Sequence, residues 1–145
     1  SVDSSLPEGY AMLARFRIAA LYAEEGNNEA AEQIYLELSE DSSIDIFYRD
    51  SALLLSVMNA PNSADKNSLI ERIADISGFV GPLQGLALET SAGLYLELNN
   101  TDKAISSLTQ ASKLSDIPPS LQQRISQSLL IISDKHTESS SVVAE

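Results

Sequence analysis

The chain has 145 residues, of which 43% are hydrophobic, so it is long enough to form one domain with a substantial core. Asp and Glu number 21 against 9 Lys and Arg, which gives a formal net charge of −12. This acidic balance argues against a nucleic-acid-binding protein, which needs a basic surface, and against direct adsorption to anionic lipid. It suits basic or neutral protein partners.

The composition also excludes most catalytic and metal chemistry. There is no Cys, which rules out disulfides, thiolate metal sites and a Cys nucleophile, and the single His136 lies in a polar segment. The sequence has no G-x-S-x-G motif and no residue set that could supply nucleophile, base and oxyanion donors together. We therefore expect no catalytic residue, no metal site and no cofactor. No apolar run approaches the roughly 20 residues that a membrane-spanning helix needs.

Apolar residues that recur with helical spacing predict about seven helices, and no segment shows the alternation of a strand. The predicted helices cover approximately residues 9–25, 28–38, 45–59, 65–76, 83–98, 101–111 and 119–132. The breaks between them are rich in Gly, Pro and Asn. Residues 1–8 are expected to form a linker, and the Ser-rich segment 136–145 a disordered tail.

Local signals set the ends of several helices. Gly26 is expected to supply the left-handed turn after the first helix. Asn28 and Thr101 are predicted to cap the helices that follow the two Asn-rich breaks. Residues 77–82 are predicted to form a turn that places Phe79 in the seam between the two halves of the chain.

The two halves of the sequence repeat each other. A shift of 73 residues aligns the breaks and pairs small and large residues at matched positions. The pairs are Ala19 with Ala92, Tyr22 with Tyr95, Gly26 with Asn99, Ala31 with Ala104, Tyr35 with Leu108 and Ile44 with Ile117. Small residues let two antiparallel helices approach, and large residues fill the gaps beside them. An internal repeat of helical hairpins indicates an all-α solenoid, here in one domain over residues 9–135.

These residues resemble the tetratricopeptide repeat, whose pattern is W-x₂-L-G-x₂-Y followed by A-x₃-F. The first copy reads Arg15-x₂-Ile18-Ala19-x₂-Tyr22 and then Ala31-x₃-Tyr35, and the second reads Leu88-x₂-Ser91-Ala92-x₂-Tyr95 and then Ala104-x₃-Leu108. The family's Trp and final Pro are absent, and each hairpin is followed by an extra helix. The resemblance implies a tetratricopeptide-like, right-handed α-α superhelix.

In that repeat family, the first helix of each hairpin lines a concave surface that binds a peptide segment of a partner. The resemblance implies a protein-binding groove at the corresponding positions of this chain. Those positions are Leu13, Phe16, Arg17, Ala20, Leu86, Glu89 and Gly93.

The run GYAMLARFRIAALYAEEGNNEAAEQIYLELSED, followed by FYRDSALLL, is similar to the periplasmic domain of the YfgM-like family, the ancillary subunit of the Sec translocon, in its alphaproteobacterial form. The resemblance covers most of residues 9–132. It implies a single N-terminal membrane anchor upstream of this sequence and a helical domain on the periplasmic side of the bacterial inner membrane. It also implies Sec translocon subunits, periplasmic chaperones or exported chains as partners. The predicted function is a non-catalytic protein–protein interaction module, and the alternative is a self-associating scaffold subunit of a membrane or envelope assembly.

Some side chains admit both a binding and a packing interpretation. The 5 tyrosines could stack on a ligand, but the repeat pattern favours packing between helices. Arg15 and Arg17 could hold a partner's carboxylate, and the preferred interpretation is that they are bridged within the domain. The acidic clusters do not have the spacing of a calcium-binding loop and are interpreted as solvated faces.

Overall fold

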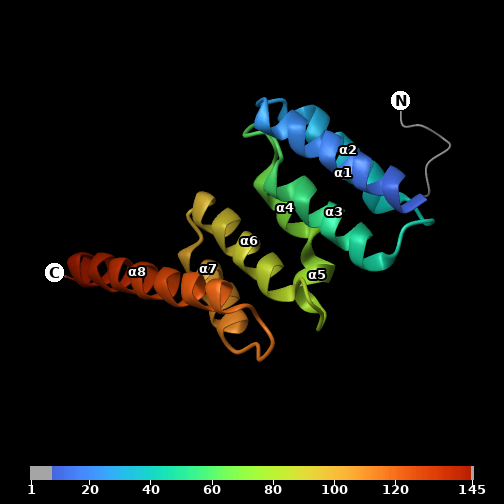
Figure 1. The fold of residues 1–145 in the computed structure, drawn as a ribbon. Helices are drawn as coiled ribbons and strands as arrows, with labels where there is room; N and C mark the ends of the chain where they lie inside the picture. Colours follow the sequence, from blue (N-terminus) through green and yellow to red (C-terminus); the bar gives the residue numbers. More distant parts are fainter. Residues whose placement is uncertain (1–7, 145) are drawn as a thin grey trace. The chain divides into compact units, whose positions relative to one another are not determined.

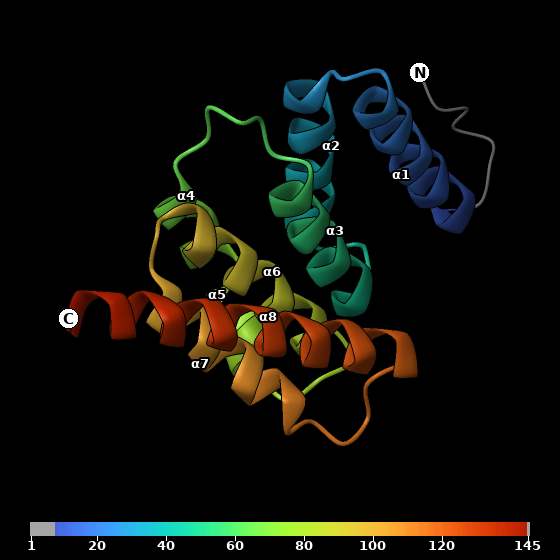
Figure 2. The same cartoon turned by 90° about the vertical axis from the view of Figure 1, so that its left-hand side faces the viewer.

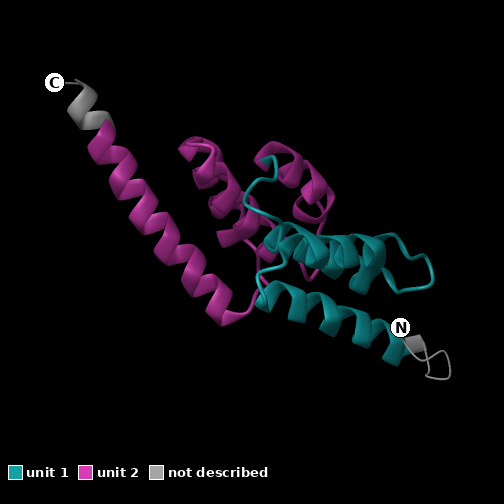
Figure 3. Ribbon diagram, turned by 90° about the horizontal axis from the view of Figure 1, so that it is seen from above, with its two compact units in different colours: residues 1–65 teal, residues 66–145 magenta. Residues whose placement is uncertain are grey.

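The computed structural model of the chain describes residues 8–144, while residues 1–7 and Glu145 lie outside the described part. The chain divides into two compact units, residues 1–65 and 66–145, called unit 1 and unit 2 (Figure 3). The boundary falls inside the single domain predicted over residues 9–135. The predicted linker lies outside the described residues except for Glu8, which begins the first helix.

The described residues form eight α-helices and no strand, which confirms the all-α prediction (Figure 1). Unit 1 contains α1 (Glu8–Glu24), α2 (Asn28–Glu40) and α3 (Ile46–Met58). Unit 2 contains α4 (Lys66–Arg72), α5 (Ala74–Gly78), α6 (Gln84–Glu97), α7 (Thr101–Ser112) and α8 (Pro119–Ala144).

The helix predicted over residues 65–76 is divided in the structure into α4 and α5. Between them Ile73 has φ −105° and ψ 9°, which interrupts the regular helical backbone. The side chain of Ile73 is fully buried, as Leu69 and Ile76 nearly are. Phe79 is 71% exposed in the loop after α5, and its predicted place between the two halves of the chain stays a prediction. The buried apolar side chains of this segment lie in or between α4 and α5, and the loop after α5 is exposed.

The last helix continues beyond the apolar pattern that predicted it. We expect a disordered tail over residues 136–145, whereas α8 runs to Ala144. Residues 120–144 contain neither Gly nor Pro, so the local chain chemistry gives the helix no stop signal. Within this stretch the Nε2 atom of His136 lies 3.3 Å from the Oδ1 atom of Asp102 on α7.

The turn between α1 and α2 is a Schellman motif followed directly by an N-cap. Gly26 adopts φ 81°, and its N–H donates to the carbonyl of Ala23 at 3.0 Å. The N–H of Asn27 donates to the carbonyl of Tyr22 at 2.8 Å. The side chain of Asn27 then accepts a hydrogen bond from the N–H of Ala30 at 3.2 Å. One residue thus completes the end of α1 and caps α2.

The turn between α6 and α7 has the same hydrogen bonds. Asn99 adopts φ 58°, and its N–H donates to the carbonyl of Leu96 at 3.0 Å. The N–H of Asn100 donates to the carbonyl of Tyr95 at 2.8 Å, and its side chain accepts from the N–H of Lys103 at 3.2 Å. The repeat therefore extends from side-chain identity to individual backbone hydrogen bonds.

The two predicted caps are wrong by one residue. Asn28 and Thr101 are the first residues of α2 and α7, and the caps are Asn27 and Asn100. The physical reason is the Schellman turn, which needs only one left-handed residue. The next residue is therefore already in place to act as the cap.

Each hairpin has its own core, which is completed by the helix that follows the hairpin. Figure 2 shows the three helices of unit 2 that do this, α6, α7 and α8. The buried core of unit 1 consists of Ala19, Ala31, Tyr35, Leu38 and Ala52. The buried core of unit 2 consists of Leu88, Ala92, Ala104, Leu108, Ala111, Leu121 and Ile125. A shift of 73 residues carries every buried member of the first core onto a buried member of the second. The repeating element therefore has three helices, and this architecture is compatible with an α-solenoid.

Candidate functional site

The predicted groove residues of unit 1 lie on one stripe of α1, and three of them lie at or near the surface. Leu13 is 57% exposed. Arg17 is exposed, and its Nη1 atom lies 3.8 Å from the Oε1 atom of Glu24 on the same helix. Ala20 is partly buried. The assignment of these three residues to a binding surface remains a prediction.

Phe16 occupies a different environment from its neighbours on that stripe. It is partly buried against the unit 1 core, and its ring centroid lies 6.1 Å from that of Tyr35 on α2. Its ring therefore contributes to packing between α1 and α2, whatever it adds to a binding surface.

The predicted groove residues of unit 2 lie on one stripe of α6. Leu86 is partly buried, and Gly93 is exposed with nothing within 4 Å of the place where a Cβ would lie. The carboxylate of Glu89 accepts hydrogen bonds from both Nε and Nη2 of Arg124 on α8, each at 3.0 Å. The hydrogen bond to Glu89 raises the pKa of Arg124 above its ordinary value. The Glu89 charge is thus compensated within unit 2.

The tyrosines divide between packing and exposure. Tyr35 is buried in the unit 1 core, and Tyr95 is partly buried against the unit 2 core. Burial raises the pKa of Tyr35. Tyr10, Tyr22 and Tyr48 are 64%, 36% and 40% exposed, so the packing interpretation does not extend to all of them.

Large apolar side chains are exposed along α1 and at the start of α3. Those on α1 are Tyr10, Leu13, Ile18, Leu21 and Tyr22, and those at the start of α3 are Ile46, Phe47 and Tyr48. The only fully buried residue of α1 in its described part is Ala19. The exposed apolar residues of α1, from Tyr10 to Tyr22, are called the α1 face.

The matched face of α6 is buried at two positions and partly buried at the others. A shift of 73 residues carries Ile18 onto Ser91 and Leu21 onto Leu94, and both of these α6 residues are buried. The helices α4 and α5 pack against α6. Contacts at both ends of α6 fix this packing. They are the hydrogen bond from Gln84 Nε2 to the Ser77 carbonyl at 3.2 Å and the ion pair of Lys66 with Glu97 at 3.7 Å.

A pocket of about 340 Å³ opens in unit 1 between α1, residues 41–45 and α3. Ala11, Met12 and Ile44 form its apolar part. Its polar part includes Arg15, Asp41, Ser43 and Asp45, and Tyr48 completes the lining from α3.

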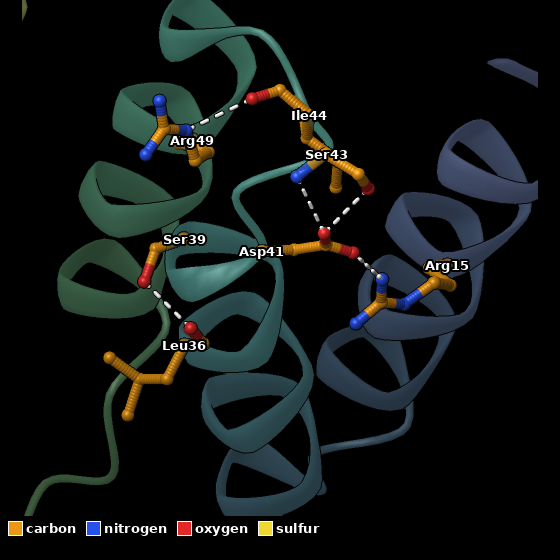
Figure 4. A network of polar contacts seen from close by, with 7 residues as sticks. All are labelled: Arg15, Leu36, Ser39, Asp41, Ser43, Ile44 and Arg49. Atoms are coloured by element: carbon orange, nitrogen blue, oxygen red, sulfur yellow. Dashed lines mark hydrogen bonds and ion pairs between the residues drawn. The ribbon is translucent and has the colours of Figure 1, made fainter. Parts of the chain in front are cut away.

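A hydrogen-bond network holds the polar side of this pocket in place (Figure 4). Arg15 Nη1 donates to Asp41 Oδ2 at 3.1 Å, while Asp41 Oδ1 accepts from the hydroxyl of Ser43 at 2.6 Å and from its N–H at 3.0 Å. The side-chain hydrogen bond from Ser43 lowers the pKa of Asp41 most, and the backbone bond and Arg15 add to the effect. Arg49 Nε donates to the carbonyl of Ile44 at 3.0 Å and ties the loop to α3. Arg15 therefore forms an ion pair within unit 1, in agreement with the interpretation preferred from the sequence.

Two absences hold for the part of the chain that the structure describes. Over residues 8–144, no helix combines the length and the apolar character needed to cross a bilayer. Nor do the described residues bring three or more His, Asp or Glu side chains together in an arrangement that could hold a metal ion.

The fold and this site define a class of protein, an all-α chain of helical-hairpin repeats with an exposed apolar helix face. Comparisons with protein-family models, with curated proteins and with solved structures find no match. The resemblance to the YfgM-like family therefore rests on the sequence residues described above and stays a prediction.

Proposed function

We propose that the chain is a non-catalytic protein–protein interaction module with a tetratricopeptide-like superhelical fold, which binds its partner through the α1 face. The observation that carries this proposal is the row of exposed apolar side chains on α1. Tyr10 and Leu13 are 64% and 57% exposed, and Leu21 is 39% exposed. Contiguous exposed apolar surface on a folded protein marks interaction sites.

The comparison between repeats supports the same surface. In unit 2 the matched helix α6 has two helices packed against it, α4 and α5, and buries Leu94 at the position that corresponds to Leu21. A partner helix on the α1 face would bury the corresponding side chains of unit 1. The helix-in-groove mode of peptide recognition uses this type of surface.

The resemblance supplies the proposed partners and place. They are Sec translocon subunits, periplasmic chaperones or exported chains, at the periplasmic side of the bacterial inner membrane, with an anchor upstream of this sequence. The formal net charge of −12 favours partners that are neutral or basic. No step of this function requires a catalytic residue or a cofactor.

The test is capture of partners from membrane and periplasmic extract of the source bacterium, identified by mass spectrometry. The informative variant carries Leu13→Ser and Leu21→Ser, both at exposed positions of the α1 face. Leu130→Ser with Ile131→Ser is the matched control, because these side chains are also exposed but lie on α8. Loss of translocon or chaperone partners with the first pair alone is the expected result.

Two other results would overturn this proposal. Equal capture by both double variants would show that the α1 face is not the binding surface. A concentration-dependent mass in sedimentation that disappears in Leu13→Ser, Leu21→Ser, with no foreign partner captured, would establish the scaffold alternative, in which the α1 face binds a second copy.

A further inference from the structure

The place in unit 2 that matches the unit 1 pocket is filled by the chain's own side chains. A Cβ at Gly85 would lie 3.0 Å from Cγ2 of Ile117, 3.2 Å from Cδ2 of Leu121 and 3.5 Å from Cδ1 of Leu114. Leu121 and Leu88 are buried in the unit 2 core. These leucines close the space between α6, the loop before α8, and α8 itself.

The same positions in unit 1 carry polar or aromatic groups. Met12, at the position that matches Gly85, takes up part of the corresponding space and lines the pocket that stays open beside it. A shift of 73 residues replaces Leu88 by Arg15, Leu114 by Asp41 and Leu121 by Tyr48. Each of the three replacements lines the pocket of about 340 Å³. Ile44, which matches Ile117, keeps its apolar identity and also lines the pocket. Unit 1 therefore lacks the three leucines that fill the matched space of unit 2.

We propose that this pocket binds a leucine, or a similarly branched aliphatic side chain, of a peptide segment that carries a basic residue beside it. The proposal rests on the interaction function above and names a second contact point for the same partner class. The side chains of Leu114 and Leu121 in unit 2 show which chemistry fills the matched space. A volume of about 340 Å³ is at the small end of ligand pockets, which span about 300–1,000 Å³.

The negative charge of Asp45 at the edge of the pocket favours a basic residue beside the leucine of the bound peptide. Both oxygens of the Asp41 carboxylate are engaged, one by Ser43 and one by Arg15, so the positive charge of Arg15 is compensated. Asp45 uses Oδ1 to accept the N–H of Phe47 at 2.9 Å, and it has no ion-pair partner among the described residues. Its exposed carboxylate leaves a negative charge beside the apolar part of the pocket, which a Lys or Arg side chain would neutralise.

The proposal is tested by titrating isotope-labelled protein with capped peptides and following backbone amide signals by NMR. The probe is the peptide GSLKSG, and the comparison peptides are GSAKSG, without the leucine, and GSLESG, with the charge reversed. We expect signal changes at Ala11, Ser43 and Tyr48 with the probe. Loss of the leucine is expected to weaken binding roughly tenfold or more, and reversal of the charge by about two- to fivefold.

Asp45→Asn isolates the charge, because Asn keeps the N-cap of α3 while removing the carboxylate. In this variant the preference for GSLKSG over GSLESG is expected to vanish while the preference for leucine over alanine is kept. Asp116→Asn is the matched control, since Asp116 is an exposed residue of the corresponding loop of unit 2. It is expected to leave both preferences unchanged.

Three results would overturn the proposal. They are equal affinity for the three peptides, tighter binding of GSLESG than of GSLKSG, and signal changes that fall outside the pocket. Partner capture that still depends on Leu13 and Leu21 would then show that the interaction function stands without the pocket. Capture that does not depend on these leucines, together with leucine-dependent signals at the pocket, would instead place the function there and remove it from the α1 face.

Discussion

Gly85 and Gly93 lie on the same helix in opposite surroundings, and together they measure the packing of α8. A Cβ at Gly93 would meet nothing within 4 Å, whereas at Gly85 it would lie 3.0 Å from Ile117 and 3.2 Å from Leu121. Replacing Gly by Ala inside a helix stabilises it by about 1 kcal/mol, and we expect this full gain for Gly93→Ala. Overpacking costs roughly 1–3 kcal/mol, so Gly85→Ala should be neutral or destabilising by up to about 2 kcal/mol.

A larger side chain at position 85 sharpens the same prediction. Met12 occupies the matched position of unit 1, and Gly85→Met would need the space that Leu114 and Leu121 fill. We expect the free energy of unfolding of this variant to fall by about 3 kcal/mol or more, because Met brings three more heavy atoms than Ala into a closed core. Urea denaturation followed by far-UV circular dichroism measures the free energies of unfolding. Equal stabilisation by Gly85→Ala and Gly93→Ala would refute the packing of α8 against Gly85.

Three other outcomes can be measured on single variants. Gly26→Ala, at φ 81°, should lower the free energy of unfolding by about 1 kcal/mol, whereas Asn99→Gly, at φ 58°, should raise it by up to about 1 kcal/mol. Thermal denaturation compares the two variants. Changes of the same sign would contradict the left-handed turns. Hydrogen bonds from Ser43 lower the pKa of Asp41, so its carboxylate adds stability above the unfolded-state pKa and loses it as pH falls through the folded-state pKa. Asp41→Asn should therefore flatten the acid side of the stability–pH profile, and a profile identical to that of the wild type would count against the network. Phe16→Ala should lower the free energy of unfolding by about 2–3 kcal/mol, measured in urea, because its ring packs against the unit 1 core. A loss below about 0.5 kcal/mol would show that the ring serves the surface instead.

The hairpins could be predicted from the sequence because their determinants are local. The stop at Gly26 and the small residues Ala19 and Ala31 all act within one turn or one pair of helices. The errors are local too. Asn27 and Asn100, not their successors, cap the second helices, because one Asn both ends the turn and begins the helix.

The pocket could not be predicted, because its parts are brought together only by the fold. Arg15 and Asp41 are 26 residues apart, and each taken alone is an ordinary charged residue of an acidic chain. Glu89 and Arg124 are separated by 35 residues, so no local pattern indicates that this predicted groove residue forms an ion pair. A signal for the pocket was present in the repeat. In the first copy, Leu88 and Leu114 of the second are replaced by the charged residues Arg15 and Asp41, and Leu121 by Tyr48.

The arrangement of the two cores has a consequence for the order in which the chain folds. Every buried member of the unit 1 core lies between Ala19 and Ala52, so that core is complete before the residues of unit 2 have been synthesised. Helical contacts that are close in sequence form rapidly, and domains fold as units from the N-terminus during synthesis. We expect the first hairpin to be compact while Gly85 and its leucines are still inside the ribosome. The nascent chain would then carry the open pocket and the α1 face before its second half has left the ribosome.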